Sequence, residues 1–173
     1  MSTFCFLKTM AMSRTWKPSV TVAAIATRVE GGITQFLMIE EETIDGVRIN
    51  QAAGHLDPNE SLEQAVIRET LEETAHDFVP DALVGTYMSK FYSPKSGEEV
   101  TYLRFAFSGK VVRQHDMPLD TGILRAMWMN YEEITACQEQ HRSPLVLRCI
   151  DDFLAGQKAP LDLMYTHTSV LIK

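Results

Sequence analysis

Three carboxylates and one guanidinium lie within six consecutive residues near the middle of this chain: Arg68, Glu69, Glu72 and Glu73. Clustered carboxylate oxygens, with no cysteine or histidine among them, suit a hard divalent cation such as Mg²⁺ or Mn²⁺. Arg68 contributes one positive charge and therefore cannot balance three glutamates. The alternative interpretation is an acidic helix face in contact with water, and the position of these residues in their helix decides between the two.

The residues before this cluster predict a helix that begins at Ser61. Ser61 and Gln64 have the spacing of a capping box, and apolar residues recur at helical spacing from Leu62 to Ile67. At about 100° per residue, the three glutamates fall on the side of the helix that carries this apolar stripe. Burying an unpaired carboxylate costs several kcal/mol, so this arrangement favours a bound cation over a solvated face.

Six positions around this helix share a spacing that is typical of one enzyme family: Gly54, Glu60, Arg68, Glu69, Glu72 and Glu73. The pattern resembles the Nudix box of the Nudix hydrolases, and every charged position of that box is matched. The departures are Thr70 in place of an aliphatic residue, Ala75 in place of glycine and His76 in place of an apolar residue. Only Ala75 bears on the backbone, because a helix that ends in a left-handed conformation costs alanine about 1 kcal/mol relative to glycine.

The resemblance implies a fold and a set of roles. The Nudix fold is an α/β/α sandwich around a mixed β-sheet, and its reaction is the hydrolysis of a phosphoanhydride bond with Mg²⁺ or Mn²⁺. On this pattern the metal ligands are Glu69, Glu72, Glu73 and the carbonyl oxygen of Ala53. Glu69 and Glu73 share the role of general base, and Arg68 acts in catalysis by holding Glu69 and Glu72 in position. Glu60 is expected to pair with Arg68 rather than to contact the metal.

The rest of the chain predicts strands on both sides of this helix. Runs of β-branched and apolar residues predict strands at 20–29, 36–39, 47–49, 82–91, 100–112 and around 128. Gly31-Gly32 predicts a hairpin turn, and Ser143-Pro144 and Gly156 bound a second amphipathic helix. Glu40, Glu41 and Glu42 are expected to form a solvated strand end. Strands before and after a central helix indicate an α/β sandwich around a mixed sheet.

Two arginines are expected to bind the phosphates of a substrate, Arg104 and Arg48. Arg104 lies in the middle of a predicted strand, where it either belongs to a surface ladder or points into a cavity and meets phosphate. Nudix enzymes often recruit a further acidic residue from a later loop, and the candidates here are Glu98, Glu99, Asp116 and Asp120. His55 is expected to be structural or to face solvent, and Lys95 to be an exposed loop residue.

Further segments resemble one subgroup of the family, the phosphatase NudJ subgroup. They are WKPSVTVAAI, QAAGHLDPNESL, YLRFAF, RSPLV and AGQKAPLDL, which together span most of the chain from Trp16 to Leu163. The resemblance implies release of orthophosphate from nucleoside di- and triphosphates or from thiamine-type diphosphates. The alternatives are a nucleotide-sugar or coenzyme pyrophosphatase and a non-catalytic nucleotide-sensing module. The second alternative is disfavoured because no carboxylate of the box is lost.

The composition limits the class of partner. The formal net charge is −7, which disfavours binding to nucleic acid or to an anionic membrane surface. No apolar run is long enough to span a membrane, and three widely spaced cysteines suit reduced thiols in a cytoplasm. A length of 173 residues fits one domain, expected at 18–173 after a poorly ordered arm at 1–17. The expected partner is a small phosphorylated substrate, and the expected assembly is a monomer or a homodimer.

Overall fold

Seven strands and three α-helices make up the part of the chain that the computed structural model describes, residues 16–93 and 97–172. The strands are β1 (Ser19–Glu30), β2 (Ile33–Thr43), β3 (Gly46–Gln51), β4 (Ala53–His55), β5 (His76–Ser93), β6 (Glu98–Gln114) and β7 (Ile123–Asn130). The α-helices are α1 (Leu62–Thr74), α2 (Tyr131–Ala136) and α3 (Leu145–Leu154). None of the helices in this part of the chain is long and apolar enough to cross a lipid bilayer. Apart from Trp16 and Lys17, the predicted arm at 1–17 lies outside the described residues, as does Lys95.

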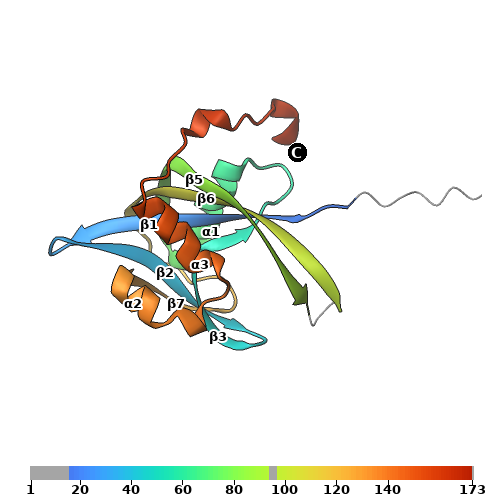
Figure 1. The fold of residues 1–173 in the computed structure, drawn as a ribbon. Coiled ribbons are helices and arrows are strands. Elements are labelled where there is room, and N and C mark those ends of the chain that lie inside the picture. The colour runs from blue at the N-terminus through green and yellow to red at the C-terminus, as the bar shows by residue number, and fades with distance from the viewer. Residues whose placement is uncertain (1–15, 94–96, 173) are drawn as a thin grey trace, which may run out of the picture.

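The strands form a mixed sheet in the order β3-β2-β1-β6-β5, to which β4 adds on β1 and β7 adds on β2. β1 runs parallel to β6, and the other pairs are antiparallel. Figure 1 shows α3 in front of this sheet and α1 behind it. Each face has its own hydrophobic core, to which α1 contributes Ala65 and Val66 on one side and α3 contributes Val146 and Ile150 on the other. A sheet between two helical layers confirms the predicted α/β/α arrangement.

β1 contributes to both cores, because successive side chains of a strand point to opposite faces. Ile25 packs in the core under α3, whereas Val22 and Ala24 pack in the core under α1. On one edge β1 pairs with β6, and on the other edge its first half pairs with the short strand β4. β1 thereby holds β4 beside α1, where the acidic cluster lies.

Strands β2 and β5 are longer than the sequence predicts. β5 begins at His76, directly after α1, and β2 continues through Glu40, Glu41 and Glu42 to Thr43. β3 and β7 bond the backbone of β2 on both edges, and Glu40 Oε2 accepts a hydrogen bond from Arg125 Nε at 2.8 Å. The prediction of a solvated strand end is therefore correct for Glu42 alone.

A buried carboxylate joins α3 to β5. Asp152 accepts hydrogen bonds from Tyr87 Oη at 3.0 Å, Arg148 Nε at 2.9 Å and Gln157 Nε2 at 3.1 Å. A side chain at Gly85 would overlap the Tyr87 hydroxyl, so glycine leaves the phenol room to reach Asp152. Since a buried carboxylate needs donors, these three bonds fasten α3 and the residues that follow it to β5.

Candidate active site

α1 begins as its residues predict, and it ends at Ala75 although alanine replaces the expected glycine there. The Ser61 Oγ accepts from the Gln64 N–H at 3.1 Å, and the Gln64 Oε1 accepts from the Ser61 N–H at 2.8 Å. At the other end Ala75 has φ 57° and ψ 30°, the left-handed conformation that favours glycine. Its N–H donates to the Leu71 carbonyl at 2.9 Å. The last two turns of α1, which carry the acidic residues, are therefore fixed by caps at both ends of the helix.

Gly54 lies in strand β4, directly opposite the carboxylate of Glu69. A Cβ atom at this position would overlap the carboxylate of Glu69. The glycine is therefore required for space, not for an unusual backbone conformation. α1 and β4 approach each other so closely that only glycine leaves room for Glu69.

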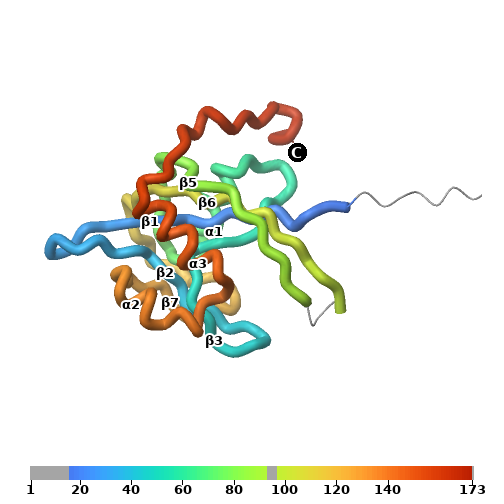
Figure 2. The backbone as a smooth tube through the Cα atoms, viewed as in Figure 1, coloured from blue at the N-terminus to red at the C-terminus, as the bar shows by residue number. Residues whose placement is uncertain are grey.

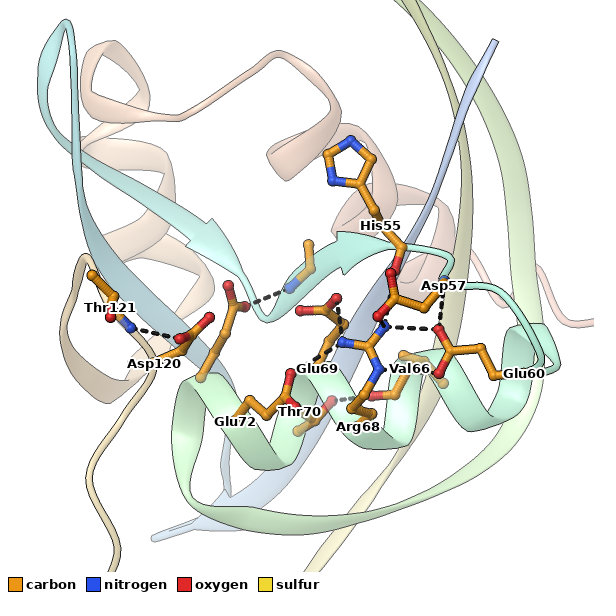
Figure 3. A network of polar contacts seen from close by, with 12 residues as sticks. His55, Asp57, Glu60, Val66, Arg68, Glu69, Thr70, Glu72, Asp120 and Thr121 are labelled. Atoms are coloured by element: carbon orange, nitrogen blue, oxygen red, sulfur yellow. Dashed lines mark hydrogen bonds and ion pairs between the residues drawn. The ribbon is translucent and has the colours of Figure 1, made fainter. Parts of the chain in front are cut away.

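Arg68 is the centre of a polar network between α1 and β4 (Figure 3). Its Nη1 donates to Glu69 Oε1 at 2.8 Å and to Glu72 Oε2 at 3.0 Å. Its Nε and Nη2 donate to the two carboxylate oxygens of Glu60 at 3.0 and 2.7 Å. Nη2 also donates to the His55 carbonyl at 3.0 Å. These bonds, those to Glu60 first, raise the pKa of Arg68 and keep it charged, and they confirm the predicted pairing with Glu60.

Glu73 is a buried carboxylate without an ion pair in the described part of the chain. It is 9% exposed, and its Oε2 accepts from the Ala53 N–H at 2.8 Å. Burial raises the pKa of Glu73 to about 8, although the Ala53 bond opposes this shift. The negative charges of Glu69, Glu41 and Asp120 raise the pKa further. This carboxylate therefore lies where a positive charge would be strongly stabilised.

Glu69 is also 9% exposed, and burial raises its pKa even though Arg68 donates to it. Glu72 differs, because its side chain is 43% exposed and is paired with Arg68. Among the three glutamates, Glu69 and Glu73 are thus the pair whose negative charges are incompletely compensated.

Ala53 presents its backbone to the same region. The carbonyl of Ala52 accepts from the Ala24 N–H at 2.9 Å and so joins β4 to β1. Because successive residues of a strand direct their polar groups to opposite edges, the N–H and C=O of Ala53 face the open edge of β4. The bond from the Ala53 N–H to Glu73 lies on that edge. The carbonyl oxygen of Ala53 is therefore directed toward the same side as Glu73.

The predicted metal ligands lie near one another, but their side chains do not converge. No three His, Cys, Asp or Glu side chains within residues 16–93 and 97–172 are arranged to hold a metal ion. Glu69 and Glu72 are turned to Arg68, and Glu73 is turned to the Ala53 N–H. The donors nevertheless fit a hard cation chemically, since they are oxygen atoms and the charges of the two buried carboxylates, Glu69 and Glu73, are incompletely compensated. Binding would require these side chains to turn from their present partners.

Two further acidic residues, Glu41 and Asp120, raise the pKa of Glu73 by their negative charge, and both lie far from it in the sequence. Asp120 lies beside the end of α1, where its N–H donates to the Glu72 carbonyl at 2.9 Å. Glu41 is the residue that sequence analysis missed, although alternation along β2 puts it on the same face as Leu37, which packs against α1. Of the four predicted acids, Asp120 is the one that affects Glu73, whereas Glu99 pairs with Lys90 in the β5–β6 hairpin.

Arg104 is buried in the sheet on the face that α3 covers. It is 8% exposed, and burial lowers its pKa. It lies beside the Cys149 thiol, and the negative charges of Glu41 and Glu73 act on it. Its Nη1 has no hydrogen-bond partner among the described residues. Of the two predicted alternatives, the surface ladder is therefore wrong, and the arginine points inward.

Arg48 and His55 are differently placed. Arg48 lies opposite Glu41 in the β2–β3 pair, and its Nη1 donates to the Val47 carbonyl at 3.4 Å. Its binding of phosphate stays a prediction. The His55 backbone belongs to the Arg68 network, but Figure 3 shows its imidazole pointing away from the carboxylates.

A family model described as NUDIX domain matches residues 17–149. The match covers most of the chain, so the protein belongs to the Nudix family, as its resemblance to the Nudix box predicted. It is accordingly a hydrolase that acts on phosphoanhydride bonds.

Comparison with individual proteins shows which members of the Nudix family this chain resembles. Phosphatase NudJ of Escherichia coli (strain K12) is 34% identical over 155 residues, which cover 86% of this chain and 92% of the relative. A NUDIX hydrolase structure from Nitrosomonas europaea is 45% identical, with a TM-score of 0.78 over 88% of this chain and 99% of that one. The Ap4A hydrolase of C. elegans is 20% identical, with a TM-score of 0.58 over 80% and 98% of the two chains, and shares the fold. The predicted similarity to the NudJ phosphatases is confirmed.

Proposed function

We propose that this protein is a divalent-cation-dependent phosphatase that removes the terminal phosphate of nucleoside di- and triphosphates or of thiamine-type diphosphates. The observation that carries the proposal is the buried carboxylate of Glu73, which has no positively charged partner in the described residues and lies at the open edge of β4. Similarity to Phosphatase NudJ over most of the chain supports the release of orthophosphate.

Glu69, Glu72, Glu73 and the carbonyl of Ala53 would hold the cation, Mg²⁺ or Mn²⁺. Such an ion neutralises phosphate oxygens and lowers the pKa of a bound water. Arg68 is a positioning residue, because it holds Glu69 and Glu72 and fastens α1 to β4 through the His55 carbonyl. Loss of Arg68 would leave the carboxylates of α1 without a fixed orientation.

Glu73 and Glu69 share the role of general base. In the reaction, a water oxygen bonds to the terminal phosphorus while the bond from phosphorus to the bridging oxygen breaks. The proton of the water passes to the carboxylate, and the shortened phosphate chain leaves with the electron pair of the broken bond. Burial makes both carboxylates more basic than a glutamate in water, which favours the proton transfer.

Arg104 would bind the phosphates. Its unpartnered Nη1 is a buried cationic donor, and a phosphate oxygen would satisfy it by a charge-assisted hydrogen bond. Because this contact forms in the bound substrate and persists in the transition state, Arg104→Ala should raise KM more than it lowers kcat.

Product analysis tests the proposal. A nucleoside triphosphate is incubated with the enzyme and Mg²⁺, without added pyrophosphatase, and the first products are separated. Nucleoside diphosphate and orthophosphate are expected. Nucleoside monophosphate and pyrophosphate would overturn the assignment, and a nucleotide-sugar cleaved faster than every triphosphate would favour the pyrophosphatase alternative.

A further inference from the structure

A row of side chains crosses four strands on the face of the sheet that is opposite α1. Arg104 on β6 lies opposite both Tyr87 on β5 and Thr21 on β1, and Thr21 lies opposite His55 on β4. Register partners share a face of the sheet, and Tyr87 packs against the core under α3. The row therefore lies on the α3 side, and its end at His55 is on β4, the strand that contacts Arg68 and Glu73.

Two polar atoms of this row are buried without a partner. Arg104 Nη1 and Thr21 Oγ1 have no hydrogen-bond partner among residues 16–93 and 97–172. Their residues are 8% and 7% exposed. Leaving a buried donor unpaired is costly, so a ligand that supplies oxygen atoms here would gain from contacts that the protein itself does not make.

Two further aromatic rings, those of Tyr102 and Phe91, lie beside the His55 end of the row. Tyr102 precedes Arg104 by two residues and so shares its face. The Tyr102 ring is stacked with that of Phe91, with centroids 5.4 Å apart and an interplanar angle of 16°, and lies 5.9 Å from the His55 ring. Phe91 is 44% exposed, and Figure 2 shows the β5–β6 hairpin extending beyond α3. We refer to His55, Phe91 and Tyr102 as the aromatic surface.

We propose that the aromatic surface binds the planar ring of the substrate, with Arg104 and Thr21 between this ring and the reacting phosphates. The proposal rests on the proposed function, because it assigns the organic part of the same substrate. The carbonyl of His55 accepts from Arg68, so this residue of β4 contributes its ring to the aromatic surface and its backbone to the carboxylate network.

The chemistry of stacking defines the substrate class. A ring that stacks on aromatic side chains needs a flat π-system, and it is not read along its hydrogen-bonding edge. The substrates are therefore phosphorylated compounds with a planar heteroaromatic ring, and the enzyme selects weakly between purines and pyrimidines. Compounds with a phosphate chain but no ring bind through Arg104 and the carboxylate site alone.

A purely structural role for the rings makes a different prediction. An aromatic pair across two strands also stabilises a hairpin, and its removal would then disturb all substrates alike. Inorganic tripolyphosphate separates the two roles, because it has the phosphoanhydride bonds of a nucleoside triphosphate and no ring.

The test is the KM of Tyr102→Ala for both compounds. Stacking predicts that KM for a nucleoside triphosphate rises by about tenfold or more, while kcat and the KM for tripolyphosphate stay within about twofold of wild type. Tyr102→Phe should behave as the wild type. Tyr92→Ala is the matched control, since Tyr92 is an exposed ring on the opposite face of β5 and should change nothing. Equal changes for the two compounds, or no change for either, would overturn the proposal.

A binding measurement tests the aromatic surface separately from the proposed hydrolysis. If the wild type hydrolyses neither compound, the proposed function fails. The aromatic surface is then tested by calorimetry with tripolyphosphate and with a nucleoside triphosphate whose terminal bridging oxygen is replaced by methylene. Weaker binding of the nucleotide alone to Tyr102→Ala supports the aromatic surface, and unchanged binding of both ligands contradicts it.

Discussion

Without metal, Glu73→Gln should be more stable than the wild type, and the difference should widen as the pH rises. Burial holds the pKa of Glu73 near 8 in the folded protein, against an ordinary value of 4.5. At about 1.36 kcal/mol for each tenfold change in proton affinity, this corresponds to at most about 5 kcal/mol, approached above pH 8. Glutamine keeps an oxygen acceptor for the Ala53 N–H and carries no charge.

The sign of this pH dependence follows from proton binding by Glu73. The folded wild type holds the Glu73 proton more tightly than the unfolded chain does. Proton binding at Glu73 therefore stabilises the folded wild type fully below pH 4.5, and this stabilisation is lost as the pH rises through about 8. Glutamine does not titrate. Urea unfolding with a chelator measures the two proteins side by side. We expect a difference of about 1 kcal/mol near pH 5 and roughly 4–5 kcal/mol near pH 9.

Glu63→Gln is the control, since Glu63 lies in the first turn of the same helix, away from the carboxylate cluster. Its stability relative to wild type should not vary with pH in this way. Saturating Mg²⁺ should stabilise the wild type more than Glu73→Gln, because a ligand that binds only the folded state adds to its stability. A stability difference between Glu73→Gln and wild type that is constant from pH 5 to pH 9 would refute the reasoning.

Three other substitutions test separate parts of the structure. Ala75→Gly should stabilise by about 0.5–1 kcal/mol in a denaturant melt, because φ is positive there, and a loss of stability would mean that the helix does not end in this conformation. Gly54→Ala should lower kcat at least about 100-fold, since its methyl group would displace the Glu69 carboxylate, and wild-type kcat would contradict the close approach. Asp152→Ala should cost about 2–4 kcal/mol in urea unfolding, because it leaves the donors of Tyr87 and Gln157 unpaired, and a cost below about 0.5 kcal/mol would exclude a structural role.

The local structure of the acidic helix could be predicted from the sequence because its signals are local. Ser61 and Gln64 are three residues apart and form the capping box that their spacing predicts. The pairing of Arg68 with Glu60 spans eight residues of the same helix and its entry. Alternating strands around one acidic helix were likewise enough to indicate the mixed sheet.

Contacts between distant segments could not be predicted in this way. Glu41 acts on Glu73 only because the side chain of Glu41 lies on the face of β2 that α1 covers. Nothing near Gly54 in the sequence shows that Glu69 will press against it from α1. The burial of Arg104 depends on α3, some forty residues further along the chain. The alternation of residues along a strand does not show which face of the sheet a helix will cover.

The most direct test of the account is the kcat of Glu73→Gln at saturating Mg²⁺ and nucleoside triphosphate, compared with wild type and with Glu63→Gln. If Glu73 supplies the base or an essential ligand, kcat should fall by about 10²–10⁴ while circular dichroism shows an intact fold. Glu63→Gln should retain wild-type kcat. A Glu73→Gln enzyme that keeps more than about half of the wild-type kcat would contradict the assignment of this carboxylate, and with it the proposed mechanism.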